Sequence, residues 1–137
     1  MTKILLADEE KDIRDFITRF FSERNFEVSN AANGIDTLLA IKKERPDIVL
    51  LELKIHDMDG IELLKRIRRM KQNTKVIVVT GLNDIEIINE AKRLGVISYL
   101  IKPIVLNNLM DIILKNLGRR RRFFKLKRAS GNVRYQR

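Results

Sequence analysis

The stretch Pro46-Asp47-Ile48-Val49-Leu50-Leu51-Glu52-Leu53 decides the fold of this chain. Its apolar run, Ile48 to Leu51, is too short for a typical helix and lies between Pro46 and a polar loop, which predicts a strand buried on both faces of a parallel sheet. The run ends at the carboxylate of Glu52. Functional crevices of open α/β sheets lie beyond the carboxyl ends of their strands, so Glu52 is the first candidate for a functional residue. The plainer alternative is that Glu52 only directs the chain into solvent.

Apolar strand-like segments and amphipathic helical segments alternate five times along the chain. The other strands are expected at about 3–7, 26–28, 76–79 and 97–101. The first two helices are expected to turn inward the apolar side chains of Ile13, Phe16, Ile17, Phe20 and Phe21, and then of Ile35, Leu38 and Ile41. Five rounds of strand and helix predict an α/β fold, a doubly wound five-stranded parallel sheet with helices on both faces.

The composition is that of a globular protein. Hydrophobic residues make up 45% of the 137 residues, enough for one domain with a real core. No apolar run reaches the roughly 20 residues of a membrane span, and the first residues lack the pattern of a signal peptide, so we expect a cytoplasmic protein without a membrane span. The chain has no cysteine and one histidine, His56, which excludes disulfides, thiolate metal sites and a histidine metal cluster.

Positive charge is concentrated at the C-terminal end of the sequence. Residues 118–137 contain nine Lys and Arg and no acidic residue, whereas residues 1–117 contain 19 Lys and Arg against 18 Asp and Glu. This pattern predicts a near-neutral domain over 1–117 followed by a flexible basic tail or linker over 118–137. Basic residues next to Phe123 and Phe124 suit contacts with nucleic-acid phosphates or anionic lipid headgroups. A solvated extension, a linker to an effector or a cloning remnant is the plainer alternative.

Charged and hydroxyl side chains follow four of the predicted strands at their carboxyl ends, which meet at one edge of a parallel sheet. These residues are Asp8, Glu9, Glu52, Thr80 and Lys102. Three carboxylates repel one another unless a cation lies among them, and oxygen ligands favour Mg²⁺. A hydroxyl and an ammonium suit phosphate oxygens. The set therefore indicates a site for Mg²⁺ and a phosphoryl group. Taken singly, Asp8 or Glu9 also fits a helix cap, Thr80 a strand-end hydroxyl without a function, and Lys102 a simple ion pair with a carboxylate.

Four motifs in this order make the chain similar to a known family. They are Ile-Leu-Leu-Ala-Asp-Glu-Glu from residue 4, the central stretch with Met-Asp-Gly at 58–60 downstream, Val-Ile-Val-Val-Thr-Gly from residue 76, and Tyr-Leu-Ile-Lys-Pro from residue 99. Over residues 1 to about 117 the chain resembles the receiver domain of two-component response regulators, such as the chemotaxis regulator. The resemblance implies a flavodoxin-like (βα)5 fold with strand order 2-1-3-4-5. It also implies a sensor histidine kinase as a partner.

The resemblance implies Mg²⁺ as a cofactor. Asp8 and Glu9 match the acidic pair that holds the ion, although the family usually has Asp at the second place. Glu52 and the backbone carbonyl of Lys54 complete the implied set of protein ligands. The side chain of Lys54 lies near the pocket mouth, where it could pair with Glu52 and compete with the ion.

The resemblance also implies a switch. Lys102 matches the lysine that contacts the phosphoryl group, and Thr80 matches the hydroxyl that is drawn toward it. Tyr99 matches the aromatic residue that turns inward when Thr80 moves. The family presents its output on the face of the fourth helix, fifth strand and fifth helix, by a shift of population between two states. On that face Ile85 and Ile112 are expected to be exposed, which leaves docking of an effector or protein partner and formation of a homodimer both open.

One departure from the family decides the functional interpretation. Glu52 stands where the family has the phosphoryl-accepting aspartate, and its side chain is one methylene longer. In-line phosphoryl transfer depends on positioning, so we expect phosphorylation to be lost or severely slowed. In this family the same replacement is familiar as an imperfect mimic of the phosphorylated state, and Glu52 fits either a receiver naturally held in its active state or an aspartate changed by design. The competing hypothesis is a structural ion pair between Glu52 and Lys102 in a pseudo-receiver. His56, where proline is usual, is a lesser departure.

Two hypotheses about function follow. The first is a signalling module, not an enzyme, that relays a signal by protein contact without depending on phosphorylation. The second is a nucleic-acid-binding protein that uses the receiver as a dimerisation scaffold and the tail over 118–137 as a phosphate anchor. The tail contains no zinc motif and is too short for a helix-turn-helix domain, so any contact with DNA through it would be non-specific.

Overall fold

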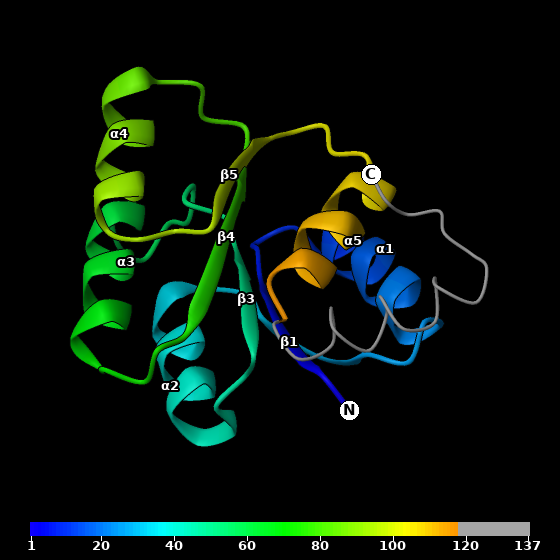
Figure 1. Cartoon of the computed structure of the whole chain (residues 1–137). Coiled ribbons are helices and arrows are strands. Elements are labelled where there is room, and N and C mark those ends of the chain that lie inside the picture. The colour runs from blue at the N-terminus through cyan, green and yellow to red at the C-terminus, as the bar shows by residue number, and fades with distance from the viewer. Residues whose placement is uncertain (118–137) are drawn as a thin grey trace. The chain divides into compact units, whose positions relative to one another are not determined.

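The computed structural model describes residues 1–117, and the chain divides after Pro103 into two units. The first unit, Met1–Pro103, contains a five-stranded parallel sheet (Figure 1). The strands lie in the order β2-β1-β3-β4-β5, which confirms the predicted fold class and strand order. Their bounds are Lys3–Ala7 (β1), Glu27–Ala31 (β2), Ile48–Leu51 (β3), Lys75–Thr80 (β4) and Ser98–Ile101 (β5).

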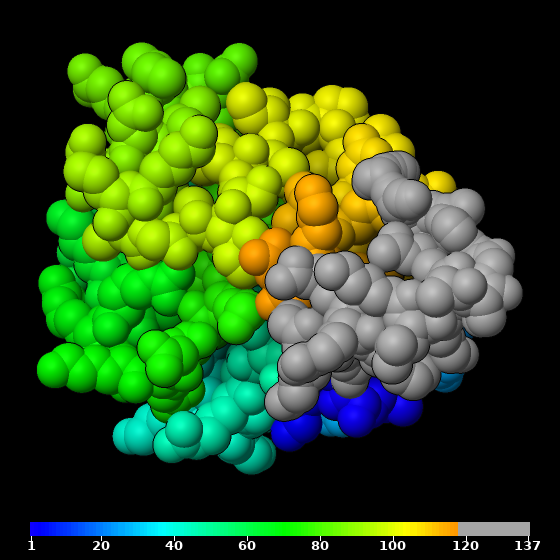
Figure 2. Space-filling view, viewed as in Figure 1, coloured from blue at the N-terminus to red at the C-terminus, as the bar shows by residue number. Residues whose placement is uncertain are grey.

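Helices cover both faces of the sheet within the first unit. Helix α1 (Lys11–Ser22) lies on one face, and α2 (Gly34–Glu44), α3 (Gly60–Arg69) and α4 (Ile85–Arg93) lie on the other (Figure 1). In the space-filling view, the cyan to yellow-green atoms of these last three helices form one continuous surface (Figure 2). The second unit contains α5 (Leu106–Lys115).

The hydrophobic core follows from the burial of the central strand. All four residues of β3 are completely buried, and successive side chains point to opposite faces, so both faces need a cover. A cluster of buried apolar side chains lies between the sheet and α2, α3 and α4; its members are Leu5, Ala7, Ala31, Val49, Leu51, Leu53, Val76 and Val78 with Ile41, Leu63, Leu64, Ile67 and Ala91. On the opposite face, α1 buries Ile17 and Phe21, and Phe21 makes an edge-to-face contact with Phe26 at 5.3 Å between ring centroids.

Two side chains that were predicted to face inward are exposed instead. Phe16 is 60% exposed because the buried side of α1 includes Ile17, and Phe16 lies about 100° around the helix from that residue. In α2, Ile35 is 49% exposed, and Thr37 takes the inward position. The hydroxyl of Thr37 donates a hydrogen bond of 2.7 Å to the carbonyl of Asn33, which makes its burial acceptable. The apolar period predicted both helices but not the centre of their buried faces.

A single arginine connects the C-terminal end of α4 to the end of α3 and the start of β4. The guanidinium of Arg68 donates to the carbonyls of Leu94 at 2.6 Å, Gly95 at 3.0 Å and Thr74 at 2.6 Å. The planar, five-donor fork of arginine suits several carbonyls at once. Gly95 has a φ of +83°, the left-handed conformation that commonly ends a helix and favours glycine. Arg68 therefore fixes the end of α4 where the chain turns into β5.

Candidate functional site

The register of the sheet brings the ends of β1 and β3 to the same level. Ala7 pairs with Leu51, and the backbone N–H of Glu52 donates to the carbonyl of Ala7 at 2.9 Å. The next residue after each strand, Asp8 and Glu52, therefore emerges at the same edge. A cavity of about 220 Å³ lies there, lined by Asp8, Glu9, Glu10, Glu52, Lys54, Gly81 and Lys102.

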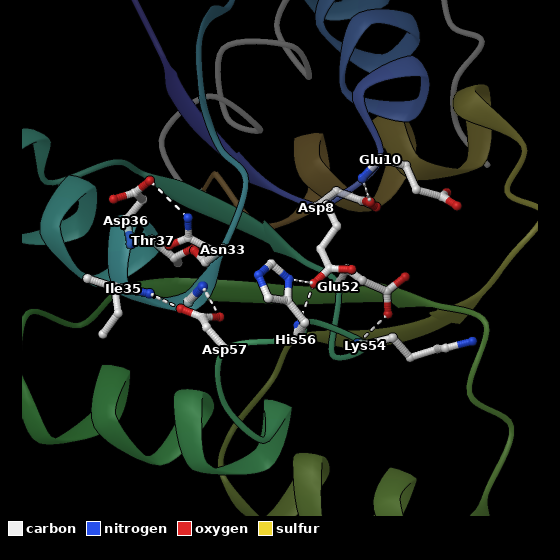
Figure 3. Close-up of polar contacts among 12 residues, drawn as sticks. Asp8, Glu10, Asn33, Ile35, Asp36, Thr37, Glu52, Lys54, His56 and Asp57 are labelled. Atoms are coloured by element: carbon white, nitrogen blue, oxygen red, sulfur yellow. Dashed lines mark hydrogen bonds and ion pairs between the residues drawn. The ribbon is translucent and has the colours of Figure 1, made fainter.

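Glu52 has partners on both carboxylate oxygens, of which Figure 3 labels Lys54. Its Oε1 lies 2.9 Å from Nζ of Lys102. Its Oε2 accepts hydrogen bonds from the backbone N–H of Lys54 at 2.8 Å and from the hydroxyl of Thr80. Glu52 is only 5% exposed, so these partners replace the water that a carboxylate loses on burial. Among residues 1–117, the ion-pair partner of Glu52 is Lys102 and not the side-chain ammonium of Lys54, a pairing that the sequence had left open.

Lys102 bridges two buried carboxylates. Its Nζ lies 2.8 Å from Oδ2 of Asp8 and 2.9 Å from Oε1 of Glu52. The other oxygen of Asp8, Oδ1, accepts the backbone N–H of Glu10 at 2.9 Å. Partial burial opposes the charged form of Lys102, but the hydrogen bonds to Asp8 and Glu52 outweigh it and raise the pKa of Lys102. The ammonium thus lies where two neighbouring carboxylates require a positive charge.

A chain of hydrogen bonds leads from Thr80 to Tyr99. The backbone N–H of Leu82 donates to the hydroxyl oxygen of Thr80 at 3.3 Å, and the hydroxyl of Tyr99 donates to the carbonyl of Leu82 at 2.9 Å. Tyr99 is half-buried and packs against the core. Burial, together with the negative charges of Glu52 and Asp84, raises the pKa of Tyr99. The two residues predicted to form a switch are therefore connected through Leu82, which the sequence did not single out.

Glu9 contacts His56 at the rim of the cavity. Its Oε2 accepts a hydrogen bond from the backbone N–H of His56 and also contacts Nδ1 of the His56 ring. Figure 3 labels His56. The hydrogen bond from His56 lowers the pKa of Glu9, and the same contact raises the pKa of His56. The side chains of His56 and Glu9 are 76% and 33% exposed. Sequence reasoning noted each residue as a departure from the family but did not predict that they meet.

Asp57, the next residue, caps α2 and was not identified from the sequence. Its Oδ1 accepts the backbone N–H of Gly34 at 2.8 Å, and its Oδ2 accepts that of Ile35 at 3.0 Å (Figure 3). These hydrogen bonds from the N-terminus of a helix lower the pKa of Asp57. The cap joins residues 23 positions apart, so no local sequence signal for a capping residue reveals it.

The arrangement of the described residues does not fit the expected magnesium site. Both oxygens of Asp8 and of Glu52 already have partners, and the ammonium of Lys102 lies between them. Glu9 is bound to His56 instead of joining them. Within residues 1–117, no three acidic, histidine or cysteine side chains form a group suited to a metal ion. Lys102 therefore supplies the positive charge that the sequence led us to expect from Mg²⁺.

The two residues predicted for the output surface belong to different units, and each is described by itself. Ile85, the first residue of α4, is 66% exposed. Ile112 of α5 is half-buried, so it is less exposed than expected. The predicted basic tail over 118–137 lies outside the described residues. Within the part that the structure describes, no helix combines the length and apolar character needed to cross a bilayer.

Known proteins of similar sequence and structure were found for most of the chain. Residues 4–114 match the family model of the response regulator receiver domain. The chain is 38% identical to Sporulation initiation phosphotransferase F of Bacillus subtilis, over 84% of this chain and 93% of that protein. It is 34% identical to Regulatory protein AtoC of Escherichia coli, over 85% of this chain but only 25% of that relative. A CheY-like receiver domain from Methanospirillum hungatei has a TM-score of 0.83 at 27% identity, over 89% of this chain and 98% of that one.

Proposed function

Because the chain belongs to the family of response regulator receiver domains, we propose that it is a receiver whose pocket is held in one signalling state by Glu52, without phosphorylation. Receivers of two-component systems are signalling modules that work with histidine kinases, phosphotransferases and effector domains. In this proposal the chain acts in the cytoplasm, and its output is a protein contact made through the region of α4 and β5.

One observation carries the proposal: the two oxygens of Glu52 are bound by Lys102 and by Thr80. By family resemblance these are the ammonium that contacts a phosphoryl group and the hydroxyl that is drawn toward it. The additional methylene of Glu52 extends its carboxylate toward both groups. A carboxylate can therefore satisfy, permanently, the two side chains that a phosphoryl group would satisfy transiently.

The contacts beyond Lys102 favour a mimic of the phosphorylated state over a purely structural ion pair. A structural pair needs only Glu52 and Lys102. Here Thr80 also donates to Glu52, and Tyr99 is half-buried and donates to Leu82, whose N–H reaches Thr80. An inward Tyr99 coupled to a Thr80 that points toward the acceptor position is the arrangement that the family resemblance implies for the signalling state.

The proposal does not make the chain an enzyme, and it does not require a bound metal ion for the signalling state. Receiver domains generally bind Mg²⁺ at their phosphorylation site. In this chain Lys102 already places a positive charge between Asp8 and Glu52. The word phosphotransferase in the name of the Bacillus relative describes that protein, which is only 38% identical.

The test is the intact mass of the chain after incubation with acetyl phosphate and a large excess of Mg²⁺, compared with Glu52→Asp and Glu52→Gln. We expect only the aspartate variant to gain the mass of one phosphoryl group, because only aspartate places the attacking oxygen in line. Modification of the unaltered chain would overturn the proposal. If none of the three proteins gains mass, the pocket is a structural ion pair and the proposal is also wrong.

A further inference from the structure

We infer that His56 is a positioning residue that withholds Glu9 from divalent cations, so that Lys102, instead of a metal ion, supplies the positive charge in the pocket of this chain. The inference concerns the same pocket and rests on the proposed function only for the location of the site. It assigns a joint role to two residues, Glu9 and His56, that otherwise look like unrelated departures from the family.

The first argument is the number of donors that His56 offers. The backbone N–H and the ring Nδ1 of His56 both contact the same oxygen, Oε2 of Glu9. Proline, the usual residue at this position in the family, has no N–H and no polar side chain, so it can offer neither contact. The acidic residue is a glutamate here, one methylene longer than the usual aspartate, which gives it the reach to meet His56.

The second argument is that the loop carrying His56 is fixed independently of Glu9. The adjacent Asp57 accepts two hydrogen bonds from the first turn of α2, at 2.8 and 3.0 Å. Close packing also holds the two ends of the loop together, since a Cβ at Gly60 would lie 2.3 Å from the carbonyl oxygen of Leu53. His56 thus belongs to a loop that is closed at its ends and bound to α2 through Asp57, and the side chain of Glu9 reaches it there.

The third argument is that the remaining carboxylates, Asp8 and Glu52, already have a cation between them. Lys102 lies within 2.9 Å of both Asp8 and Glu52, and each of these carboxylates also accepts a backbone N–H. Mg²⁺ demands oxygen ligands in near-ideal geometry and gives up its water reluctantly. A divalent ion would have to displace the ammonium of Lys102 and detach Glu9 from two donors. Both steps oppose binding.

The experiment measures Mg²⁺ affinity on the full chain, from the shift of the thermal midpoint and from amide chemical shifts, at ionic strength kept constant with NaCl. The variants are His56→Ala, which removes the ring, His56→Pro, which also removes the N–H, and Glu9→Asp, which shortens the reach. We expect weak binding by the unaltered chain and an affinity about tenfold higher for His56→Pro, the lower end of the range for residues that orient metal ligands. His56→Ala should lie between the two.

A double-mutant comparison isolates the contact. If Glu9 and His56 act through one contact, combining Glu9→Asp with His56→Pro should gain less affinity than the product of the single gains. Arg93→Ala is the matched control, because Arg93 and Glu90 form another ion pair with similar side-chain exposures of 67% and 34%, on α4. That control should bind Mg²⁺ as the unaltered chain does.

The inference is overturned if His56→Ala and His56→Pro both bind Mg²⁺ with unchanged affinity, or if the unaltered chain already binds as tightly as these variants. The outcome is separable from that of the proposed function when the phosphorylation test is repeated on Glu52→Asp combined with His56→Pro. If the His56 variants gain affinity for Mg²⁺ but this double variant stays unmodified, the proposed function alone is refuted. Modified Glu52→Asp with no gain for the His56 variants would refute this inference alone.

Discussion

Two contacts between carboxylates and a nitrogen-bearing side chain lie at the same edge of the sheet and differ mainly in exposure. Lys102 bridges Asp8 and Glu52, whose side chains are 4% and 6% exposed, whereas His56 and Glu9 are 76% and 33% exposed. Removing one partner of a buried pair leaves a charge stranded away from water, while an exposed pair contributes little to stability. The buried cluster therefore supports the folded state, and the exposed contact can matter only through where it places Glu9.

Breaking the buried cluster should have the largest effect. Lys102→Met keeps an unbranched stem of four heavy atoms but removes the ammonium, leaving Asp8 and Glu52 buried without a cation. We expect the free energy of unfolding at neutral pH to fall by about 3 kcal/mol, measured by urea denaturation. His56→Ala, at the exposed contact, should leave the midpoint nearly unchanged. If the two variants were equally stable, exposure would not be the property that distinguishes the two contacts.

Two buried threonines allow a comparison of hydrogen bonds to a charged and to a neutral acceptor within the interior. Thr80 and Thr37 are both almost completely buried, but Thr80 donates to the carboxylate of Glu52 and Thr37 to a backbone carbonyl. Thr80→Val should cost about 2 kcal/mol and Thr37→Val about 1 kcal/mol, because hydrogen bonds to charged groups are stronger. Only Thr80→Val should also shift the ring resonances of Tyr99. Equal costs with an unmoved Tyr99 would contradict the hydrogen-bonded chain through Leu82.

We expect the smallest effect at the exposed contact, where the pKa of His56 should change. The pKa of His56 should lie above its ordinary value of 6.5 and return toward it in Glu9→Gln, as followed by NMR. The raised pKa means that His56 contributes stability fully below about pH 6.5 and loses it as the pH rises through the folded pKa. The lowered pKa of Glu9 means that its contribution is lost as the pH falls through that folded value. An identical His56 titration in both proteins would show that the contact is absent in solution.

The sequence predicted those parts of the structure that depend on regular periods. The run Ile48 to Leu51 predicted a central buried strand, and the alternation of strands and helices predicted the sheet. Residues directly after strand ends could be grouped because parallel strands finish at a common edge, and Glu52 and Lys102 do lie together there.

The remaining contacts could not be predicted because they join irregular loops. Glu9 meets His56 across 47 positions, and Asp57 meets Gly34 across 23. Side chains in loops do not alternate regularly between two faces as those of strands do, so the sequence does not indicate which way they point. Only the tertiary structure reveals their partners. The sequence also did not show which cation faces the acidic side chains. A cluster of acidic residues indicates that a cation is needed, but not whether a metal ion or Lys102 provides the positive charge.

The hydrogen bonds from Arg68 hold one end of α4 and leave the other end to follow the neighbouring loop. The helix has nine residues and is about 13 Å long. Its C-terminal end is held by hydrogen bonds from Arg68, while its N-terminal end follows the loop whose Leu82 contacts Thr80. Because Arg68 holds the end near Gly95, we expect any displacement of α4 that begins at Thr80 to be larger near Ile85 than near Gly95. Ile85, the exposed first residue of α4, therefore lies at the end of the helix where a change in the pocket should be most visible to a partner.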